Sequence, residues 1–262
     1  MSAPCKRIAM WSGPRNISTA MMRAFENRAD CAVVDEPLYA AYLRGTGLAH
    51  PARDQVLNSQ SADWRLVVAA LTGAAPAPVY YQKHMAQHLL PSMDLSFTDS
   101  LLNCFLIREP RRIIASYARV RASFALQELG FSQQKRLFDR ECERLGKAPP
   151  VLDSALVLHN PRAVLARLCR RLGLPFDRAM LRWPAGPRDS DGVWAPHWYA
   201  AVWRSTGFSA PRRESAAQVP AAALTAEQER LCERAEEYYR AMRVYALGAA
   251  DTQTATHTAR RE

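Results

Sequence analysis

The sequence is poor in lysine and has no cysteine pattern that indicates a metal site or a disulfide framework. Only Lys6, Lys83, Lys135 and Lys147 are lysines among its 262 residues. Its six cysteines form no CxxC pair and no ligand spacing with the six histidines. This pattern is typical of a reduced, cytosolic compartment, and we expect no bound metal.

Long apolar runs are also missing. No segment approaches the roughly 18 uncharged apolar residues of a membrane helix, and residues 1–13 lack the apolar core of a signal peptide. We therefore expect a soluble, cytoplasmic protein with no membrane partner. The composition, 48% hydrophobic and 23% charged, excludes a disordered or collagen-like chain.

Positive charge is concentrated in two segments. The formal net charge is +10, from 35 basic and 25 acidic side chains. Residues 108–121 and 162–188 carry this whole excess, so the rest of the chain is balanced. A basic excess favours nucleic acid, a membrane surface or an anionic small ligand, and its concentration in two places favours a specific anion site. The arginines over 162–171 are interpreted as a solvated helix face.

Short apolar runs alternate with helical patterns, which is typical of βαβ units and a parallel sheet. The pattern predicts strands over residues 7–11, 31–35, 79–82, 102–107 and 151–153. It predicts helices over residues 16–28, 110–121, 161–172 and 225–247, and a loop-rich interval over 43–64. Thr225 and Gln228 have the spacing of a capping box. We expect one α/β domain over residues 1–248 and a disordered tail over 249–262.

A tight turn joins the first predicted strand to the first predicted helix. It contains Gly13, Pro14, Arg15, Asn16, Ile17, Ser18 and Thr19. Free backbone N–H groups and the dipole at a helix N-terminus attract anions, while Arg15 adds a cation and the Ser-Thr pair adds hydroxyl donors. No lysine precedes that pair, so the turn is not a Walker A loop. An ordinary strand–helix turn with Ser/Thr capping explains this segment equally well.

A second strand end carries a similar signal. Arg108 follows the strand predicted over 102–107, and Ser116 comes eight residues later, in a helix that begins at Pro110. Two anion sites at the carboxyl ends of parallel strands suit a nucleotide with phosphate at two positions.

These segments together resemble the sulfotransferases that use 3′-phosphoadenosine 5′-phosphosulfate (PAPS). Residues 11–19 are similar to the 5′-phosphosulfate loop in its Pro-Arg-x-x-Ser-Thr form, and residues 105–117 to the 3′-phosphate segment. Residues 151–175 are similar to the family's strand, acidic residue, helix and Leu-Gly-Leu ending. The resemblance implies a P-loop-NTPase-like three-layer αβα fold with a mainly parallel sheet. It also implies PAPS as donor, 3′-phosphoadenosine 5′-phosphate (PAP) as product, and no metal.

The resemblance further implies which residues hold the donor. They are the turn residues 13–19, Arg108 and Ser116. Arg15 stands where many sulfotransferases have lysine, and Asn16-Ile17 replaces a Ser-Gly pair. The family's C-terminal Arg-Lys-Gly element has no clear counterpart, and Arg188 is the nearest candidate for an arginine that closes over the 3′-phosphate.

Sulfuryl transfer needs a cation at the leaving oxygen and a base beside the acceptor. Arg15, helped by Ser18, is the candidate cation. The segment around Lys83 resembles the family segment that carries a lysine and a catalytic histidine. His84 is therefore one candidate base, or a helix cap, and Lys83 either assists the leaving group or is solvated. Glu36, at the end of the second predicted strand, is the competing base, or else a helix-capping or acceptor-orienting group.

Two aromatic groups are candidates for the acceptor pocket. One comprises Trp194, His197, Trp198 and Trp203, which would roof that pocket or stack on adenine, although an aromatic stripe of this kind belongs more often to a core. The other is the pair Tyr39 and Tyr42. His88 falls one helical turn after His84, but without a third ligand at suitable spacing we expect no metal there.

We expect transfer of a sulfuryl group from PAPS to a hydroxyl or amine of a small-molecule acceptor, with no nucleic-acid partner. One alternative is a P-loop-type nucleotide-binding phosphotransferase that has lost its Walker lysine. The other is a basic nucleic-acid-binding module, which is disfavoured because the basic segments lack interleaved aromatics and no recognised binding motif appears.

Overall fold

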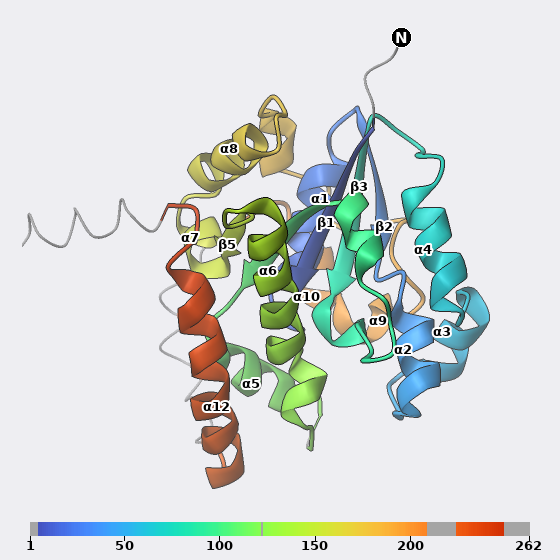
Figure 1. The fold of residues 1–262 in the computed structure, drawn as a ribbon, viewed down its shortest axis with the longest axis vertical. Helices are drawn as coiled ribbons and strands as arrows, with labels where there is room; N and C mark the ends of the chain where they lie inside the picture. Colours follow the sequence, from blue (N-terminus) through green and yellow to red (C-terminus); the bar gives the residue numbers. More distant parts are fainter. Residues whose placement is uncertain (1–4, 122, 209–223, 249–262) are drawn as a thin grey trace, which may run out of the picture.

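Five parallel strands form the centre of the computed structural model, which describes residues 5–121, 123–208 and 224–248 (Figure 1). In the sheet order β2-β3-β1-β4-β5, they span Cys31–Asp35, Val79–Met85, Lys6–Ser12, Leu102–Ile107 and Val151–Asp153. All neighbouring pairs are parallel, which confirms the predicted sheet. Strand β3 continues to Met85, beyond its predicted end at Gln82. The tail predicted over 249–262 lies outside the described residues.

Helices cover both faces of the sheet and complete a three-layer αβα fold (Figure 1). One face is covered by α1 and α8 and the other by α6 and α12, which span Ser18–Glu26, Pro161–Arg171, Phe131–Leu145 and Ala226–Arg243. Strand β1 is apolar on both sides: Ile8 and Met10 pack into the first core, and Ala9 and Trp11 into the second. Parallel strands need this composition because neither face meets water. The predicted fold class is confirmed.

The interval over residues 43–64, predicted to be loop-rich, contains both loops and helices. It holds the end of α2 and all of α3, and α4 begins at its end; the three span Tyr39–Thr46, Arg53–Ser59 and Trp64–Thr72. Leu43 and Val56 are fully buried in one core cluster. A seven-residue helix with one buried side chain has too little periodicity to be recognised in a sequence. Packing, rather than local pattern, stabilises it.

The predicted helix that begins after Thr225 is confirmed as α12, together with its capping box. The backbone N–H of Gln228 donates to Thr225 Oγ1 at 3.2 Å, and the backbone N–H of Thr225 donates to Gln228 Oε1 at 3.1 Å. The other α-helices, α5, α7, α9 and α10, span Pro110–Ala118, Ser154–His159, Ala195–Trp198 and Ala200–Trp203. Short 3₁₀ turns span Ala86–His88, Ser96–Ser100, Leu126–Leu129 and Arg178–Leu181.

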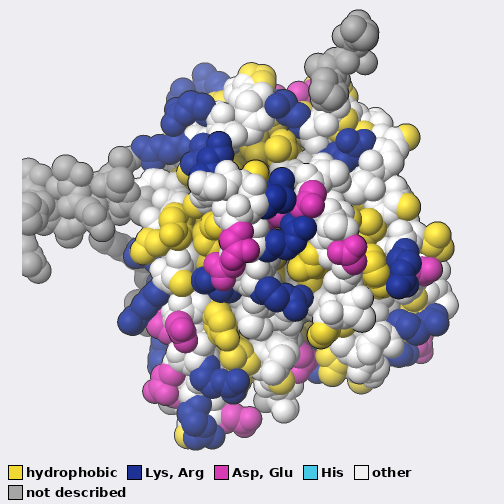
Figure 2. Space-filling model, viewed as in Figure 1, with side chains coloured by type: hydrophobic (Ala, Val, Ile, Leu, Met, Phe, Trp, Pro, Cys, Tyr) yellow, Lys and Arg dark blue, Asp and Glu magenta, His cyan; other side chains and the backbone are white. Residues whose placement is uncertain are grey.

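Charged side chains of both signs are interspersed over the face shown in Figure 2. On α8, Arg170 and Arg171 are exposed, in agreement with the interpretation of a solvated face. None of the described helices is both long and apolar enough to cross a membrane.

Candidate active site

A cavity of about 380 Å³ lies at the carboxyl ends of the central strands. Strands β1 to β4, or the segments that follow them, all contribute to its lining, because parallel strands end at the same edge of a sheet. The predicted site residues in this lining are Pro14, Arg15, Asn16, Ile17, Ser18, Thr19, Glu36, Lys83, Arg108 and Ser116. The predicted residues Gly13, His84 and Arg188 are not among the lining residues.

The turn after β1 has an unusual backbone that fixes its shape. Arg15 and Ile17 have positive φ angles of 57° and 40°, a region that costs free energy for a β-branched residue such as Ile17. Asn16, between them, is buried and donates its side-chain N–H to the carbonyl of Leu106 at 2.6 Å. This bond ties the turn to the end of β4. The strain is thus held by a contact between two neighbouring strand ends.

Gly13 has a packing role in the same turn. A Cβ atom at this position would lie 2.6 Å from the carbonyl oxygen of Leu129, so no larger residue fits without a backbone shift. Nearby, Gln134 of α6 donates to the carbonyl of Trp11 at 2.9 Å and to that of Leu106 at 3.0 Å. These contacts hold the ends of β1 and β4 together beneath the cavity.

Helix α1 directs its N-terminus into the cavity. Its first two residues, Ser18 and Thr19, line the cavity, and their hydroxyl groups make no hydrogen bond to any described residue. The first backbone N–H groups of a helix also have no partner within the helix. With the positive end of the helix dipole, these donors form an anion-binding surface.

Two arginines add positive charge that no carboxylate balances. Arg15 donates from Nε to Ser116 Oγ at 3.0 Å, and the Arg108 guanidinium donates to the carbonyl of Arg15. Within the described ranges, neither forms an ion pair. Burial, together with the charges of Arg112 and Arg15, lowers the pKa of Arg108 to about 10. Burial and the charge of Arg119 likewise lower the pKa of Arg15. A half-buried, unbalanced pair of cations is suited to an anionic ligand.

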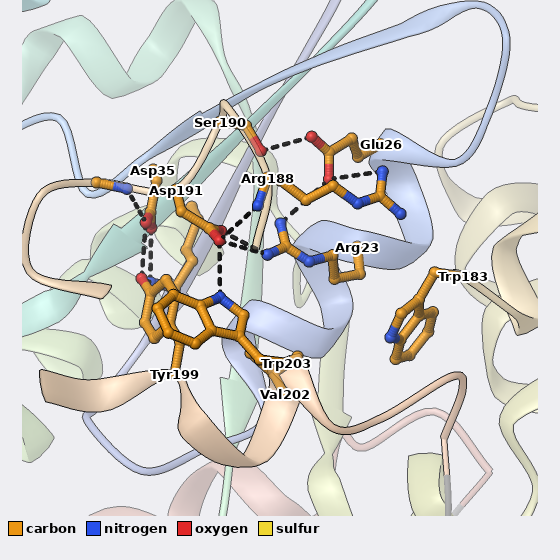
Figure 3. A network of polar contacts seen from close by, with 12 residues as sticks. Arg23, Glu26, Asp35, Trp183, Arg188, Ser190, Asp191, Tyr199, Val202 and Trp203 are labelled. Carbon is orange, nitrogen blue, oxygen red and sulfur yellow. Dashed lines mark hydrogen bonds and ion pairs between the residues drawn. The ribbon is translucent and has the colours of Figure 1, made fainter. Parts of the chain in front are cut away.

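Lys83 has the opposite environment. Its Nζ donates to Asp35 Oδ1 at 2.7 Å, to Glu36 Oε1 at 2.5 Å and to the Tyr199 hydroxyl at 2.7 Å. The Tyr199 hydroxyl in turn donates to Asp35 Oδ2 at 2.7 Å (Figure 3). Burial alone would lower the pKa of Lys83, but the charges and hydrogen bonds of Asp35 and Glu36 outweigh it and raise this pKa. Lys83 is therefore a protonated, fully balanced cation.

Glu36 presents one carboxylate oxygen for chemistry. Both hydrogen bonds that its side chain makes to described residues involve Oε1, and the residue lines the cavity. Its backbone has a positive φ of 41° at the end of β2. Burial raises its pKa; the Lys83 charge opposes this shift and the Asp35 charge adds to it. A carboxylate with a raised pKa and a free oxygen can serve as a general base.

His84 does not line the cavity, contrary to the prediction. Because β3 continues to Met85, side chains alternate through this segment, and His84 points to the face opposite Lys83. It stacks on Trp11, its register partner in β1, with ring centroids 4.2 Å apart, and bonds to Gln82 at 3.1 Å. Burial, together with the Lys83 charge, lowers its pKa to about 3. It is a neutral core side chain.

Arg188 also lies away from the cavity, in a polar network against α1 (Figure 3). Its Nη1 is 3.5 Å from Glu26 Oε2, and its backbone N–H donates to Asp191 Oδ2 at 3.0 Å. Asp191 accepts two bonds from the buried guanidinium of Arg23, at 2.5 and 2.7 Å. The structure therefore does not place Arg188 beside Arg108 and Ser116, contrary to the prediction.

The structure adds residues that sequence reasoning missed. His50, Gln87, Tyr117 and Tyr199 line the cavity, and so does His88, which was weighed only as a metal ligand. The positions of Gln87 and His88 could have indicated this, because both residues follow a strand and the ends of parallel strands line the cavity. Of the residues proposed for the acceptor pocket, Tyr39 and Trp198 line the cavity, whereas Tyr42, Trp194, His197 and Trp203 do not.

Metal ligation finds no support in the part of the chain that the structure describes. There, no three or more His, Cys, Asp or Glu side chains gather in an arrangement that could hold a metal ion. The two histidines of the β3 segment separate: His88 lines the cavity, and His84 packs in the core.

Comparison with known families gives one extensive match. A family model described as a sulfotransferase domain matches residues 6–246. Similar curated proteins include branched-chain-amino-acid aminotransferase-like proteins 1 and 2 of Arabidopsis thaliana, which are 38% and 35% identical over 207 residues. Each match covers 79% of this chain and 37% of the relative. The chain thus spans little more than a third of the length of these relatives.

Two solved structures are similar in fold. The sulfotransferase domain of the olefin synthase from Synechococcus PCC 7002 has a TM-score of 0.54 at 19% identity, covering 89% of this chain and 95% of that domain. The sulfotransferase domain from the curacin biosynthetic pathway has a TM-score of 0.52 at 16% identity, covering 90% and 99%. At these identities the likeness concerns the fold alone.

Proposed function

This chain belongs to the sulfotransferase domain family, and on that premise we propose that it transfers a sulfuryl group from PAPS to a hydroxyl or amine of a small-molecule acceptor. One observation carries the proposal. Arg15 and Arg108, with no carboxylate partner among the described residues, line the same cavity as the Glu36 carboxylate. An anionic donor needs unpaired cations, and an acceptor that loses a proton needs a base close to them.

The donor fits the available groups. PAPS carries a 3′-phosphate and a 5′-phosphosulfate, and the cavity offers two sets of hydrogen-bond donors that no carboxylate occupies. Arg108 and Ser116 would hold the 3′-phosphate. The N-terminus of α1 with Ser18 and Thr19 would hold the 5′-phosphosulfate, as helix N-termini bind phosphate elsewhere.

Arg15, Glu36 and Lys83 each have a separate role in the proposed transfer. When bound, PAPS supplies a sulfur that bonds to the acceptor atom as its bond to the phosphate oxygen breaks. Arg15 neutralises the charge that grows on that departing oxygen. The free Oε2 of Glu36 takes the proton that the acceptor loses, while Lys83 holds Oε1 and fixes the carboxylate. Lys83 is thus a positioning residue.

The aminotransferase-like names of the relatives suggest a different reaction, which the site does not support. Aminotransferase chemistry needs a lysine whose amine forms a Schiff base. Lys83 is the lysine among the described lining residues, and its protonated form is stabilised by Asp35 and Glu36. This arrangement favours sulfuryl transfer over amino transfer for the present chain.

Calorimetry with PAP tests the donor site. We expect the wild-type protein to bind PAP and Arg108→Ala to weaken binding roughly 10- to 100-fold, because a charge-assisted contact is lost. Arg112→Ala is the matched control, since Arg112 is 60% exposed and paired with Glu109. ATP with Mg²⁺ should not raise the melting temperature. No PAP binding, or PAP binding unchanged by Arg108→Ala, contradicts the proposal.

Turnover requires a second measurement. The protein is incubated with ³⁵S-labelled PAPS and a panel of hydroxyl and amine acceptors, and labelled products are separated from the donor. Transfer that depends on Arg108 and on Glu36 supports the reaction. PAP binding without transfer to any acceptor would show a nucleotide-binding protein that lacks this activity.

A further inference from the structure

One end of the cavity holds neutral side chains with buried polar atoms that make no hydrogen bond to a described residue. We name it the neutral pocket and define it by His50, Gln87 and His88, which line the cavity close to Tyr39. His88 is 2% exposed and Gln87 is 6% exposed. Neither makes a side-chain hydrogen bond to any described residue, and both His88 Nδ1 and Gln87 Oε1 are fully buried. Buried polar groups in native proteins normally have partners, so these groups point to a ligand.

The orientation of His88 limits how a ligand can meet it. Tyr39 stacks on the His88 imidazole, with ring centroids 4.7 Å apart and an interplanar angle of 12°. Tyr42 stacks on the same imidazole, with a centroid distance of 4.8 Å and an interplanar angle of 30°. The faces of the imidazole are therefore occupied by aromatic rings. Its edge, with the two nitrogens, remains for hydrogen bonding with a molecule in the cavity.

Gln87 and His50 are fixed as well. Gly130, at φ 74°, lets its backbone approach Gln87 closely; a Cβ there would lie 2.8 Å from the Gln87 backbone nitrogen and 3.0 Å from its Oε1. His50 shares a 2.8 Å hydrogen bond between Nδ1 and the Tyr39 hydroxyl, while its buried Nε2 makes no hydrogen bond and lies 3.8 Å from Glu128 Oε2. The neutral pocket is thus a set of preoriented donors and acceptors.

The neutral pocket has no free cation. Burial keeps His88 neutral by lowering its pKa well below the usual range, and burial and Arg121 lower the pKa of His50 to about 4. Of the described lining cations, Lys83 is balanced by two carboxylates, and the two arginines belong to the proposed donor end. An acceptor with a carboxylate or phosphate would find no counter-ion here and would meet Glu36. The acceptor that fits is uncharged.

We propose that the acceptor is a neutral, polyhydroxylated molecule of the carbohydrate or cyclic polyol type. Its hydroxyl groups, which both donate and accept, bond to His88, Gln87 and His50, and the reacting hydroxyl faces Glu36. Trp198 lines the same cavity and supplies a flat aromatic wall against which a sugar ring packs. A simple phenol would leave most of these groups unpaired, which costs specificity. This assignment rests on the proposed sulfuryl transfer.

The test compares defined acceptors on the PAP-loaded and PAPS-supplied protein. Methyl α-glucopyranoside and myo-inositol represent the proposed class, and 4-nitrophenol and 4-hydroxybenzoate represent a phenol and an anionic phenol. We expect at least one of the first two to bind the PAP complex in saturation-transfer NMR. We expect it to accept ³⁵S with a kcat/KM at least about tenfold above both phenols. A preference for either phenol overturns the assignment.

Variants separate this assignment from the donor site. His88→Phe keeps the stack between the tyrosines and should raise the KM for the polyol roughly tenfold, with PAP affinity unchanged. His84→Phe is the matched control, because His84 is also buried and stacked but lies outside the cavity; it should leave KM unchanged. Gln87→Leu should also raise the KM for the polyol, and it leaves the stacking of Tyr39 and Tyr42 on His88 unchanged. Unchanged KM in both His88→Phe and Gln87→Leu overturns the assignment.

The two proposals fail differently. If the protein does not bind PAP, the donor assignment fails, and the acceptor assignment falls with it. If it binds PAP and sulfates a phenol or an amine, while neither polyol binds nor reacts, only the acceptor assignment is wrong.

Discussion

Two kinds of cation, a half-buried arginine pair and a buried lysine, line the same cavity and differ in how their charge is balanced. The arginine pair, Arg15 and Arg108, has no carboxylate partner among the described residues, and burial lowers the pKa of both. Lys83 lies between two carboxylates, and its pKa is raised. The pair therefore favours an incoming anion, whereas the lysine is already neutralised by the fold.

The difference shows that buried positive charge alone does not identify a ligand site. A charge removed from water costs free energy unless it is paired. The network of Arg23 with Asp191 and Glu26 repeats the balanced arrangement beside Asp35 and Tyr199 (Figure 3). Such clusters stabilise the fold, and the unbalanced pair is the part that a ligand can complete.

In the cluster of Lys83, Asp35 and Glu36, the largest effect on activity is expected from removing the free carboxylate oxygen of Glu36. Glu36→Gln should lower kcat roughly 10²- to 10⁴-fold, because the base is lost. Burial raises the pKa of Glu36, and the base is active only when deprotonated. Wild-type kcat/KM should therefore fall as pH drops through a pKa above the ordinary value of about 4.3. Rates across pH 4.5 to 8 measure this limb.

Glu26→Gln provides the control for that profile. Glu26 is a carboxylate paired with arginines in the network of Figure 3, and it does not line the cavity. It should keep both the rate and the acid limb. An acid limb that persists in Glu36→Gln would assign the titration to another group.

Removing the balanced cation should destabilise the fold. Lys83→Met leaves Asp35 and Glu36 facing each other without a counter-ion, which should lower the free energy of unfolding by about 3–5 kcal/mol. Lys135→Met is the matched control, because Lys135 pairs with Asp139 on the helix surface, where Asp139 is 50% exposed. That change should cost about 0.5 kcal/mol or less. Equal losses in urea denaturation would break the contrast between buried and surface pairs.

Removing a member of the arginine pair should weaken ligand binding and leave the stability of the ligand-free protein unchanged. Arg15→Ala should weaken PAP binding roughly 10- to 100-fold, because a charged contact to phosphate is lost. The ligand-free protein should keep its melting temperature, because no ion pair is broken. Thermal scans with and without PAP measure both quantities. A marked loss of stability without ligand would place Arg15 among the structural cations.

Arg188 gives the smallest expected effect. Arg188→Ala should leave PAP affinity within about twofold and cost less than about 1 kcal/mol of stability, because its contact with Glu26 is long and partly solvated. Calorimetry and urea denaturation check the two values. A tenfold loss of PAP affinity would return Arg188 to the donor site.

The strand ends were the most predictable part of the site. Arg15, Glu36 and Arg108 each follow a short apolar run, and a parallel sheet brings such positions to one edge. His84 was misplaced because β3 is longer than its apolar pattern suggests, so the pleat turns the side chain away. Tyr199 was missed because it reaches Asp35 from 164 residues away in the chain.

The sequence by itself determined the parallel sheet, the turn before the first helix and the charged residues that follow the strands, because apolar periodicity and helix N-termini are local properties. The tertiary structure alone decided which cations are balanced. Asp35 becomes the register partner of Lys83 only because β2 and β3 lie side by side. No carboxylate reaches Arg15 and Arg108 in the described part of the chain. Pairing depends on distance across the sheet, and that distance is a property of strand order and register.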